Sequence, residues 1–256
     1  MKLEGKTVII TSNSSVFIKL TKLLIENSGK SRSDFIIIAE NGLPFKDRFR
    51  KRIEKIGLLP ALDELLYTSY EALFNHWKKA ERKLFSDTDI TSFSPDILTD
   101  TVNKRSVSIL DSLKTFEVKN IISIGSGFIP TRLLEQFNLK INIHPGILPY
   151  YKGIGSPEAI MRGDLSFLGW SIHELATKID SGSIIHNHTI SFKILEKMTF
   201  AEVYITIYRS AIINFYLTIN NSDKSEMNFN SNTKYFAFVR FTLFIKYKFK
   251  PVHNSV

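Results

Sequence analysis

Short apolar runs alternate with longer helix-period segments through the first two thirds of the chain. Residues 6–10 and 34–39 are apolar runs bounded by polar residues, and each predicts a buried strand. Residues 16–26 carry Phe17 and Leu20 on one helical face and predict a helix between the two strands. A strand, a helix and a second strand are typical of a crossover connection, which implies that the two strands run parallel.

The same alternation continues toward the C-terminus. Further strands are predicted from short apolar runs at 118–124, 140–144, 169–175 and 183–190. Further helices are predicted from 3.6-residue periodicity at 45–85, 102–116 and 199–219. We expect breaks in the first of these helices at Gly57 and Pro60, and a polar loop at 91–101. Together the elements predict an α/β fold with a doubly wound, mostly parallel, Rossmann-like sheet.

The chain divides at about residue 220. Residues 1–219 predict one α/β domain with a helical insert at about 43–85. Residues 220–256 begin with a polar stretch that predicts a linker. Phe241–Phe249 then alternates apolar with basic or polar residues, as in a half-buried strand. We expect this short C-terminal extension either to pair with the core sheet or to build a homodimer, because an exposed apolar strand needs a partner.

Positive charge is concentrated in two parts of the chain. The formal net charge is +9, from 34 Lys and Arg against 25 Asp and Glu, and basic residues gather at 46–55 and at 234–250. Such segments can attract phosphates, nucleic acid or a membrane surface. A solvated helix face and a basic tail explain them equally simply, so we expect no nucleic-acid partner.

Composition excludes several classes of protein. The chain has no cysteine, which removes thiol nucleophiles, disulfides and Cys-ligated metals. Its apolar runs at 35–39 and 210–219 are shorter than the roughly 18 to 20 residues of a membrane span. The N-terminal apolar run, Val8–Ile10, is also too short for an export signal. We therefore expect a cytoplasmic protein without a membrane span.

Candidate chemistry follows the predicted strands, at the edge where α/β sheets bind ligands. Asn142 and His144 are two residues apart in a strand, so they point to the same face. Asp180 stands 36 residues after His144, in Asp180-Ser181-Gly182. An amide and a protonated imidazole can hold an oxyanion, while a carboxylate can orient the imidazole, raise its pKa and manage a proton. No nucleophile is among them, which favours direct acyl transfer to an amine.

These residues resemble a known family. The pattern Asn142-x-His144, Leu148-Pro149-x-x-x-Gly153 and Asp180-x-Gly182 resembles the catalytic signature of the 10-formyltetrahydrofolate-dependent formyltransferases. The likeness is dense over about residues 118–190, weakens toward the N-terminus and ends after about residue 219. It implies that residues 1–219 are the catalytic domain of an enzyme whose cofactor is 10-formyltetrahydrofolate, the formyl donor.

The resemblance also implies roles for individual residues. Asn142 and His144 would stabilise the tetrahedral oxyanion, and Asp180 would assist proton removal and keep His144 charged. No metal is expected. The folate pocket would be bounded by three segments, whose residues are Gly127, Phe128 and Ile129, then Leu148, Pro149 and Gly153, then Leu175, Lys178 and Ile179.

Other motifs carry less weight. Gly125-Ser126-Gly127 is half of a dinucleotide-binding fingerprint, but a proline stands in place of the third glycine. His186 and His188 could share a strand face and bind a metal, yet strand-surface histidines are the simpler reading. His173 and Trp170 are expected to pack or to line the pocket.

The acceptor amine is inferred by exclusion. Enzymes of this family that formylate methionyl-tRNA carry a C-terminal β-barrel, whereas positions 220–256 are all that follow Ile219 here. Enzymes that act on glycinamide ribonucleotide carry a glycine-rich loop after the first strand, where this chain has Thr11–Ser15. A nucleotide-linked amino sugar is therefore the expected acceptor. The alternatives are those two acceptors, a formyltetrahydrofolate hydrolase, or an inactive basic relative that binds nucleic acid.

Overall fold

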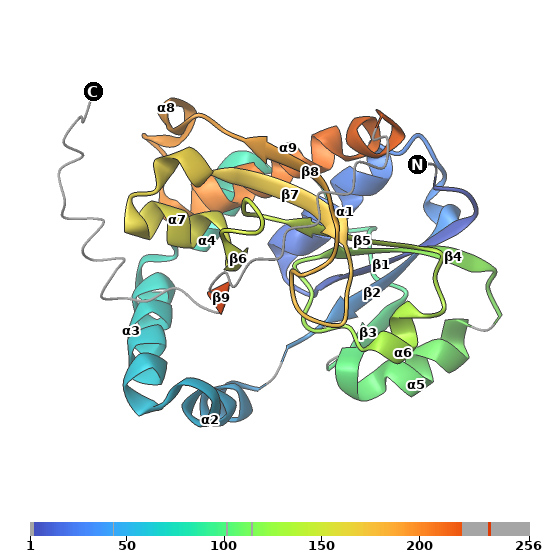
Figure 1. The fold of residues 1–256 in the computed structure, drawn as a ribbon, viewed down its shortest axis with the longest axis horizontal. Coiled ribbons are helices and arrows are strands. Elements are labelled where there is room, and N and C mark those ends of the chain that lie inside the picture. The colour runs from blue at the N-terminus through green and yellow to red at the C-terminus, as the bar shows by residue number, and fades with distance from the viewer. Residues whose placement is uncertain (1–2, 43, 101, 114, 222–234, 237–256) are drawn as a thin grey trace.

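The computed structural model describes residues 3–42, 44–100, 102–113, 115–221 and 235–236. Its centre is a sheet whose strand order is β3 (Ile97–Thr99), β2 (Phe35–Glu40), β1 (Lys6–Ser12), β4 (Val118–Ile124), β5 (Leu139–His144), β7 (Gly169–Glu174) and β8 (Ile184–Thr189). The first five strands of this order are parallel, and β7 is antiparallel to both of its neighbours. The predicted mostly parallel sheet is confirmed (Figure 1).

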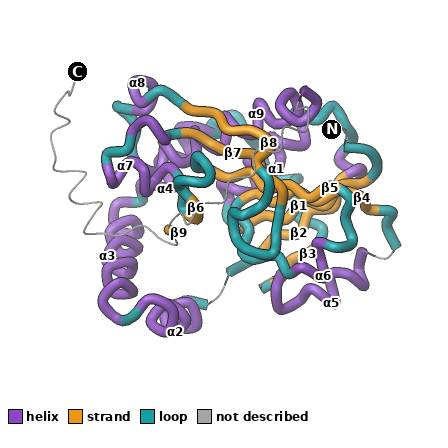
Figure 2. Tube along the Cα trace, in the orientation of Figure 1, coloured by secondary structure: helices purple, strands orange, loops and turns teal. Residues whose placement is uncertain are grey.

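Helices cover both faces of the sheet, as a doubly wound fold requires (Figures 1 and 2). One face packs against α1 (Ser15–Glu26), α4 (His76–Leu84) and α9 (Phe200–Asn221). The other packs against α5 (Val102–Leu113) and α6 (Thr131–Leu134). Alternate strand residues serve the two cores, so Ile9 belongs to the first and Ile10 to the second. Every residue of β2 is buried, as expected for a strand covered on both faces.

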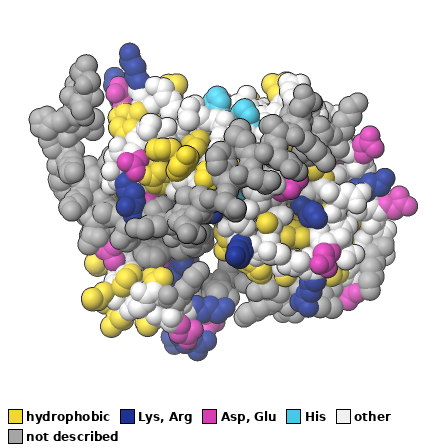
Figure 3. All heavy atoms as spheres, viewed as in Figure 1, with side chains coloured by type: hydrophobic (Ala, Val, Ile, Leu, Met, Phe, Trp, Pro, Cys, Tyr) yellow, Lys and Arg dark blue, Asp and Glu magenta, His cyan; other side chains and the backbone are white. Residues whose placement is uncertain are grey.

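The helical insert lies between β2 and β3. It consists of α2 (Phe45–Ile56), α3 (Leu58–Phe74) and α4, and Arg52 of α2 pairs with Glu64 of α3 at 3.0 Å. In Figure 1, α2 and α3 stand to one side of the sheet. Apolar side chains reach the surface over this region in Figure 3. Leu59 of α3 is 79% exposed. The described side chains of α2 are exposed or half-buried, which agrees with a solvated basic helix.

Two expectations about this part of the chain are wrong. Pro60 does not break a helix, because it lies in the first turn of α3, where its missing N–H costs no hydrogen bond. The helices separate at Gly57 and at Asn75, which have φ of 86° and 53°. The polar loop expected at 91–101 contains the short strand β3, which pairs with the end of β2.

The remaining elements are short. They are the 3-10 helices η1 (Arg32–Asp34) and η2 (Leu165–Phe167), the helices α7 (Ser156–Arg162) and α8 (Phe192–Leu195), and the strands β6 (Lys152–Gly153) and β9 (Tyr235–Phe236). β6 and β9 form a separate two-stranded parallel sheet. The strand predicted at Phe241–Phe249 lies outside the described residues.

Candidate active site

Strand pairing brings three polar residues into one row at the carboxyl end of the sheet. Asn142 of β5 lies opposite Ser123 of β4 on one side and His173 of β7 on the other. Residues in register on neighbouring strands share a face, and Asn142 and His144 are two apart on one strand. This is the face that α5 and α6 cover, because Ile10 lies opposite Ser123 in the same row. The site therefore opens where that helix layer ends.

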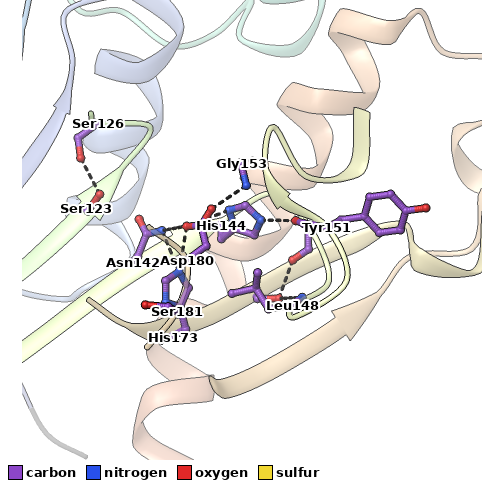
Figure 4. Close-up of polar contacts among 12 residues, drawn as sticks. Ser123, Ser126, Asn142, His144, Leu148, Tyr151, Gly153, His173, Asp180 and Ser181 are labelled. Atoms are coloured by element: carbon purple, nitrogen blue, oxygen red, sulfur yellow. Dashed lines mark hydrogen bonds and ion pairs between the residues drawn. The ribbon is translucent and has the colours of Figure 1, made fainter. Parts of the chain in front are cut away.

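His173 fixes the orientation of the Asn142 amide (Figure 4). Nδ1 of His173 lies 2.7 Å from the carbonyl oxygen of Glu174, which can only accept, so Nδ1 carries the hydrogen. Nε2 of His173, 2.9 Å from Nδ2 of Asn142, is therefore an acceptor in the neutral imidazole. The second hydrogen of the amide points at Oδ1 of Asp180 over 3.4 Å. That contact is long and weak, so its hydrogen is the one that a ligand can take.

Asp180 lies in the turn after β7 and faces the same centre. Its φ of 50° is in the left-handed region, and the residue is buried. Oδ2 accepts the backbone N–H of Gly153 at 2.7 Å, while Oδ1 lies 3.7 Å from Nδ1 of His144 and 3.6 Å from Nε2 of His173. Burial acts to raise the pKa of Asp180, but the two imidazoles, when they carry a proton, and the Gly153 N–H outweigh it and hold that pKa well below its usual range. The carboxylate is ionised at neutral pH.

His144 is buried beside this carboxylate. Its Nε2 donates to the carbonyl oxygen of Tyr151 at 2.7 Å, which leaves Nδ1 facing Asp180. Burial lowers the pKa of the imidazole, and Asp180 opposes this only in part. The sequence-based expectation that Asp180 keeps His144 charged is therefore corrected: the desolvation of a fully enclosed ring outweighs the nearby charge, and Nδ1 is a proton acceptor at neutral pH.

The three expected walls of the folate pocket lie in different surroundings. Leu148 and Pro149 are buried, and the backbone of Leu148 is held by the side chains of Ser171 and Asn187 at 2.9 and 2.8 Å. Gly153 contacts Asp180 directly. This loop is therefore anchored at both of its ends next to the polar centre.

The other two walls are less enclosed. Ile129 is buried in the core cluster against which Leu175 packs, so these two segments approach one another through that cluster. The residues that remain exposed are Gly127, Phe128, Lys178 and Ile179. Exposed side chains at the edge of a cleft can contact a ligand without rearranging the core.

Sequence reasoning missed one residue of this centre and one residue that holds a neighbouring loop. His173 was expected only to pack or line the pocket, because its place beside Asn142 depends on the antiparallel pairing of β7, which no local pattern indicates. Glu40, at the end of β2, accepts the backbone N–H of Gly127 at 2.7 Å and so anchors the loop after β4. A carboxylate directly after an apolar run was the signal available for it.

A cavity of about 220 Å³ lies further along the same edge. Its walls come from the ends of β2 and β3 and from α5, and they are formed by Asn41, Ile97, Leu98, Thr99, Asp100, Ser108, Ile109 and Ser112. Amide, hydroxyl and carboxylate groups alternate there with apolar side chains. Four strand spacings of about 4.8 Å separate β3 from β5, so the cavity lies roughly 19 Å from the Asn142 centre.

Within the described ranges, no group of three or more His, Asp or Glu side chains is placed to hold a metal ion. His186 and His188 lie on β8 and stack beside Trp170, with ring centroids 5.5 and 5.0 Å from the indole. No helix in the described part of the chain has the length and apolar character of a membrane span.

Fold and site together define a doubly wound α/β protein with an amide, two imidazoles and a carboxylate at the carboxyl edge of its sheet. The family described as Formyl transferase matches residues 7–211. The match covers most of the chain, and the chain belongs to the formyl transferase family.

Individual curated proteins match a smaller part of the chain than the family does. A methionyl-tRNA formyltransferase of Streptococcus agalactiae serotype III (strain NEM316) is 34% identical over 84 residues, which is 32% of this chain and 26% of that protein. The chain thus matches about a quarter of the length of this curated relative.

Solved structures share the fold. A sugar N-formyltransferase from Shewanella sp FDAARGOS_354 aligns with a TM-score of 0.53 at 18% identity, over 90% of this chain and 76% of that one. A glycinamide ribonucleotide transformylase from Symbiobacterium toebii aligns with a TM-score of 0.53 at 14% identity, over 86% and 87%. These identities support the architecture alone.

Proposed function

We propose that the chain transfers a formyl group from 10-formyltetrahydrofolate to a primary amine. The observation that carries the proposal is the convergence of Asn142, His144, His173 and Asp180 on one centre in a member of the formyl transferase family. No side chain of this centre is a strong nucleophile, which favours direct attack by the amine over a covalent enzyme intermediate.

The first step forms a tetrahedral intermediate. The amine nitrogen attacks the formyl carbon, a C–N bond forms, and the carbonyl electron pair moves onto oxygen. Asn142 donates a hydrogen bond to this oxyanion, with the amide hydrogen that makes only the long contact to Asp180 in the free protein. The anionic Asp180 stabilises the ammonium that develops on the attacking nitrogen.

The second step moves a proton and releases the product. Asp180 is a poor terminal base, because its pKa lies far below neutral pH. Nδ1 of neutral His144 accepts the proton from the ammonium, and Asp180 at 3.7 Å stabilises the resulting imidazolium. The C–N10 bond then breaks, the proton goes to N10, and the formamide and tetrahydrofolate leave.

The donor would lie among the three folate-wall segments. Phe128 and Ile179 are exposed by 41% and 43%, so both offer apolar surface to a flat ring system. The expected contacts also include Gly127, Leu148, Pro149, Gly153, Leu175 and Lys178. A cytoplasmic location and a homodimer stay predictions.

For the acceptor we propose a nucleotide-linked amino sugar. The relatives' names include methionyl-tRNA, glycinamide ribonucleotide and sugar formyltransferases, so names alone do not discriminate. The support comes from the segment after the first strand, Thr11–Ser15, which lacks the glycines expected in an enzyme that acts on glycinamide ribonucleotide.

The test measures tetrahydrofolate release from 10-formyltetrahydrofolate with nucleotide-linked amino sugars, glycinamide ribonucleotide, methionyl-tRNA or water alone. We expect release with an amino sugar, and a loss of about 100- to 1000-fold in Asn142→Ala. Asp180→Asn and His144→Asn should also be inactive, whereas His188→Asn, which changes an exposed histidine, should retain wild-type rates. Release without any amine would make the protein a hydrolase, and folate binding without release would contradict the transfer.

A further inference from the structure

The small sheet formed by β6 and β9 lies directly against the candidate active site. β9 pairs in parallel with β6, with Lys152 opposite Tyr235 and Gly153 opposite Phe236. In Figure 1, β9 lies beside β6 although the two are far apart in the sequence. β9 thus pairs with the end of the loop that runs from Leu148 to Gly153.

Both ionisable partners of the site are held by the backbone of this loop (Figure 4). The carbonyl of Tyr151 accepts from Nε2 of His144 at 2.7 Å, and the N–H of Gly153 donates to Oδ2 of Asp180 at 2.7 Å. Lys152 lies between these two contacts and belongs to β6. Any displacement of β6 therefore changes the surroundings of His144 and Asp180 together.

We propose that β9 positions the active-site loop through β6, so that these two residues, far along the chain from the other site residues, contribute to the site. This inference rests on the proposed function for its catalytic consequence, but its structural content can be tested without turnover. A two-stranded sheet is marginal by itself. Each of these two strands therefore stabilises the other, and β9 adds to the contacts with Ser171, Asn187 and Asp180 that already hold the loop.

The pairing is separable from the main fold. β6 and β9 belong to a sheet of their own, and neither pairs with the seven-stranded sheet. The two core clusters on the faces of the main sheet contain no residue of β6. Loss of β9 pairing should therefore leave the global unfolding transition nearly unchanged while it loosens the site.

The experiment uses the full chain with Tyr235→Pro and Phe236→Pro together. Proline has no N–H and cannot continue a strand ladder, so the double variant should release β6. The matched control Asn228→Pro places proline in the same tail outside β9. The double variant Tyr235→Thr and Phe236→Val keeps both backbone N–H groups and favours a strand, and it should behave as the wild type.

The readout is the NMR titration of the His144 imidazole in the protein without ligands. Burial and the contact with the Tyr151 carbonyl act on its pKa in opposite directions, so a loop released from this position should give a shifted pKa. The turnover of the proline variant should fall by about 100-fold, as expected for misplaced catalytic groups, with a nearly unchanged unfolding midpoint.

The outcomes separate the two proposals. An unchanged His144 titration in the double proline variant would overturn the positioning role of β9. Wild-type protein that releases no tetrahydrofolate with any acceptor would overturn the proposed function, and the titration would still decide the role of β9.

Discussion

At the residue scale, the orientation of the Asn142 amide depends on a neighbour that does not reach the reacting atoms. His173 offers Nε2 as an acceptor because its Nδ1 hydrogen is already given to the carbonyl of Glu174. The contact of His173 with Glu174 and its contact with Asn142 therefore direct one hydrogen of the Asn142 amide toward His173. The other hydrogen of this amide stays available to a ligand. His173 is a positioning residue in this arrangement.

Replacing His173 by Phe tests this role. The substitution keeps a ring but removes the acceptor, so the Asn142 amide is free to rotate, and kcat should fall by about 100-fold with little change in the KM of the donor. His173→Gln retains an acceptor oxygen and should recover part of the rate. Equal loss in both variants would show that the ring is needed for packing alone.

The buried His144 makes the stability of the protein depend on pH. Its pKa in the folded protein lies below the 6.5 of the unfolded chain, so the unfolded chain takes up the proton first as the pH falls. The free energy of unfolding is unaffected above that value and decreases below it, by at most about 1.4 kcal/mol per pH unit for one group.

Urea unfolding of wild type and His144→Asn between about pH 7 and about pH 5 measures this term. We expect a steeper decrease in the wild type, because the variant has lost the group that titrates. Parallel curves would mean that His144 is not desolvated in the folded protein.

At the scale of elements, the turn after β7 shows why a glycine follows Asp180. A Cβ on Gly182 would lie 1.9 Å from the carbonyl oxygen of Glu174, so any side chain there must displace the turn. Gly182→Ala should lower the free energy of unfolding by about 1 to 3 kcal/mol and should also move Asp180. Ser181→Ala, in the same turn but exposed, is the matched control for urea unfolding and for turnover.

Most elements could be predicted from the sequence, because buried strands and amphipathic helices carry their own periodicity. Asn142 and His144 were found together for the same reason, since two residues of one strand need no tertiary information. β3 was missed because three residues in a polar segment have no detectable period, and they are a strand only through pairing with β2. The role of His173 was not predicted, because the residue opposite it on β5 depends on whether β7 runs parallel or antiparallel to β5.

At the scale of the whole molecule, the helix α9 contributes to the core on one face of the sheet. It packs against the sheet and contacts α1 and α4, and Phe215 is fully buried in that core. Phe215→Ala should lower the free energy of unfolding by about 3 to 5 kcal/mol. Leu217→Ala, on the same helix but 66% exposed, should change it little. Equal effects in urea unfolding would contradict the packing of α9.

The antiparallel register of β7 with β5 affects the specific activity that a protein preparation can reach. A slip of one residue would turn His173 to the opposite face and place an apolar or acidic neighbour beside Asn142. Gly169 fixes the alignment of β7 with its other neighbour, β8, because a residue with a Cβ at that place would lie 2.0 Å from the carbonyl oxygen of His188. Under the proposed function, a molecule with a slipped β7 would lack the oriented Asn142 amide, so the specific activity of refolded protein would report the fraction of molecules in register.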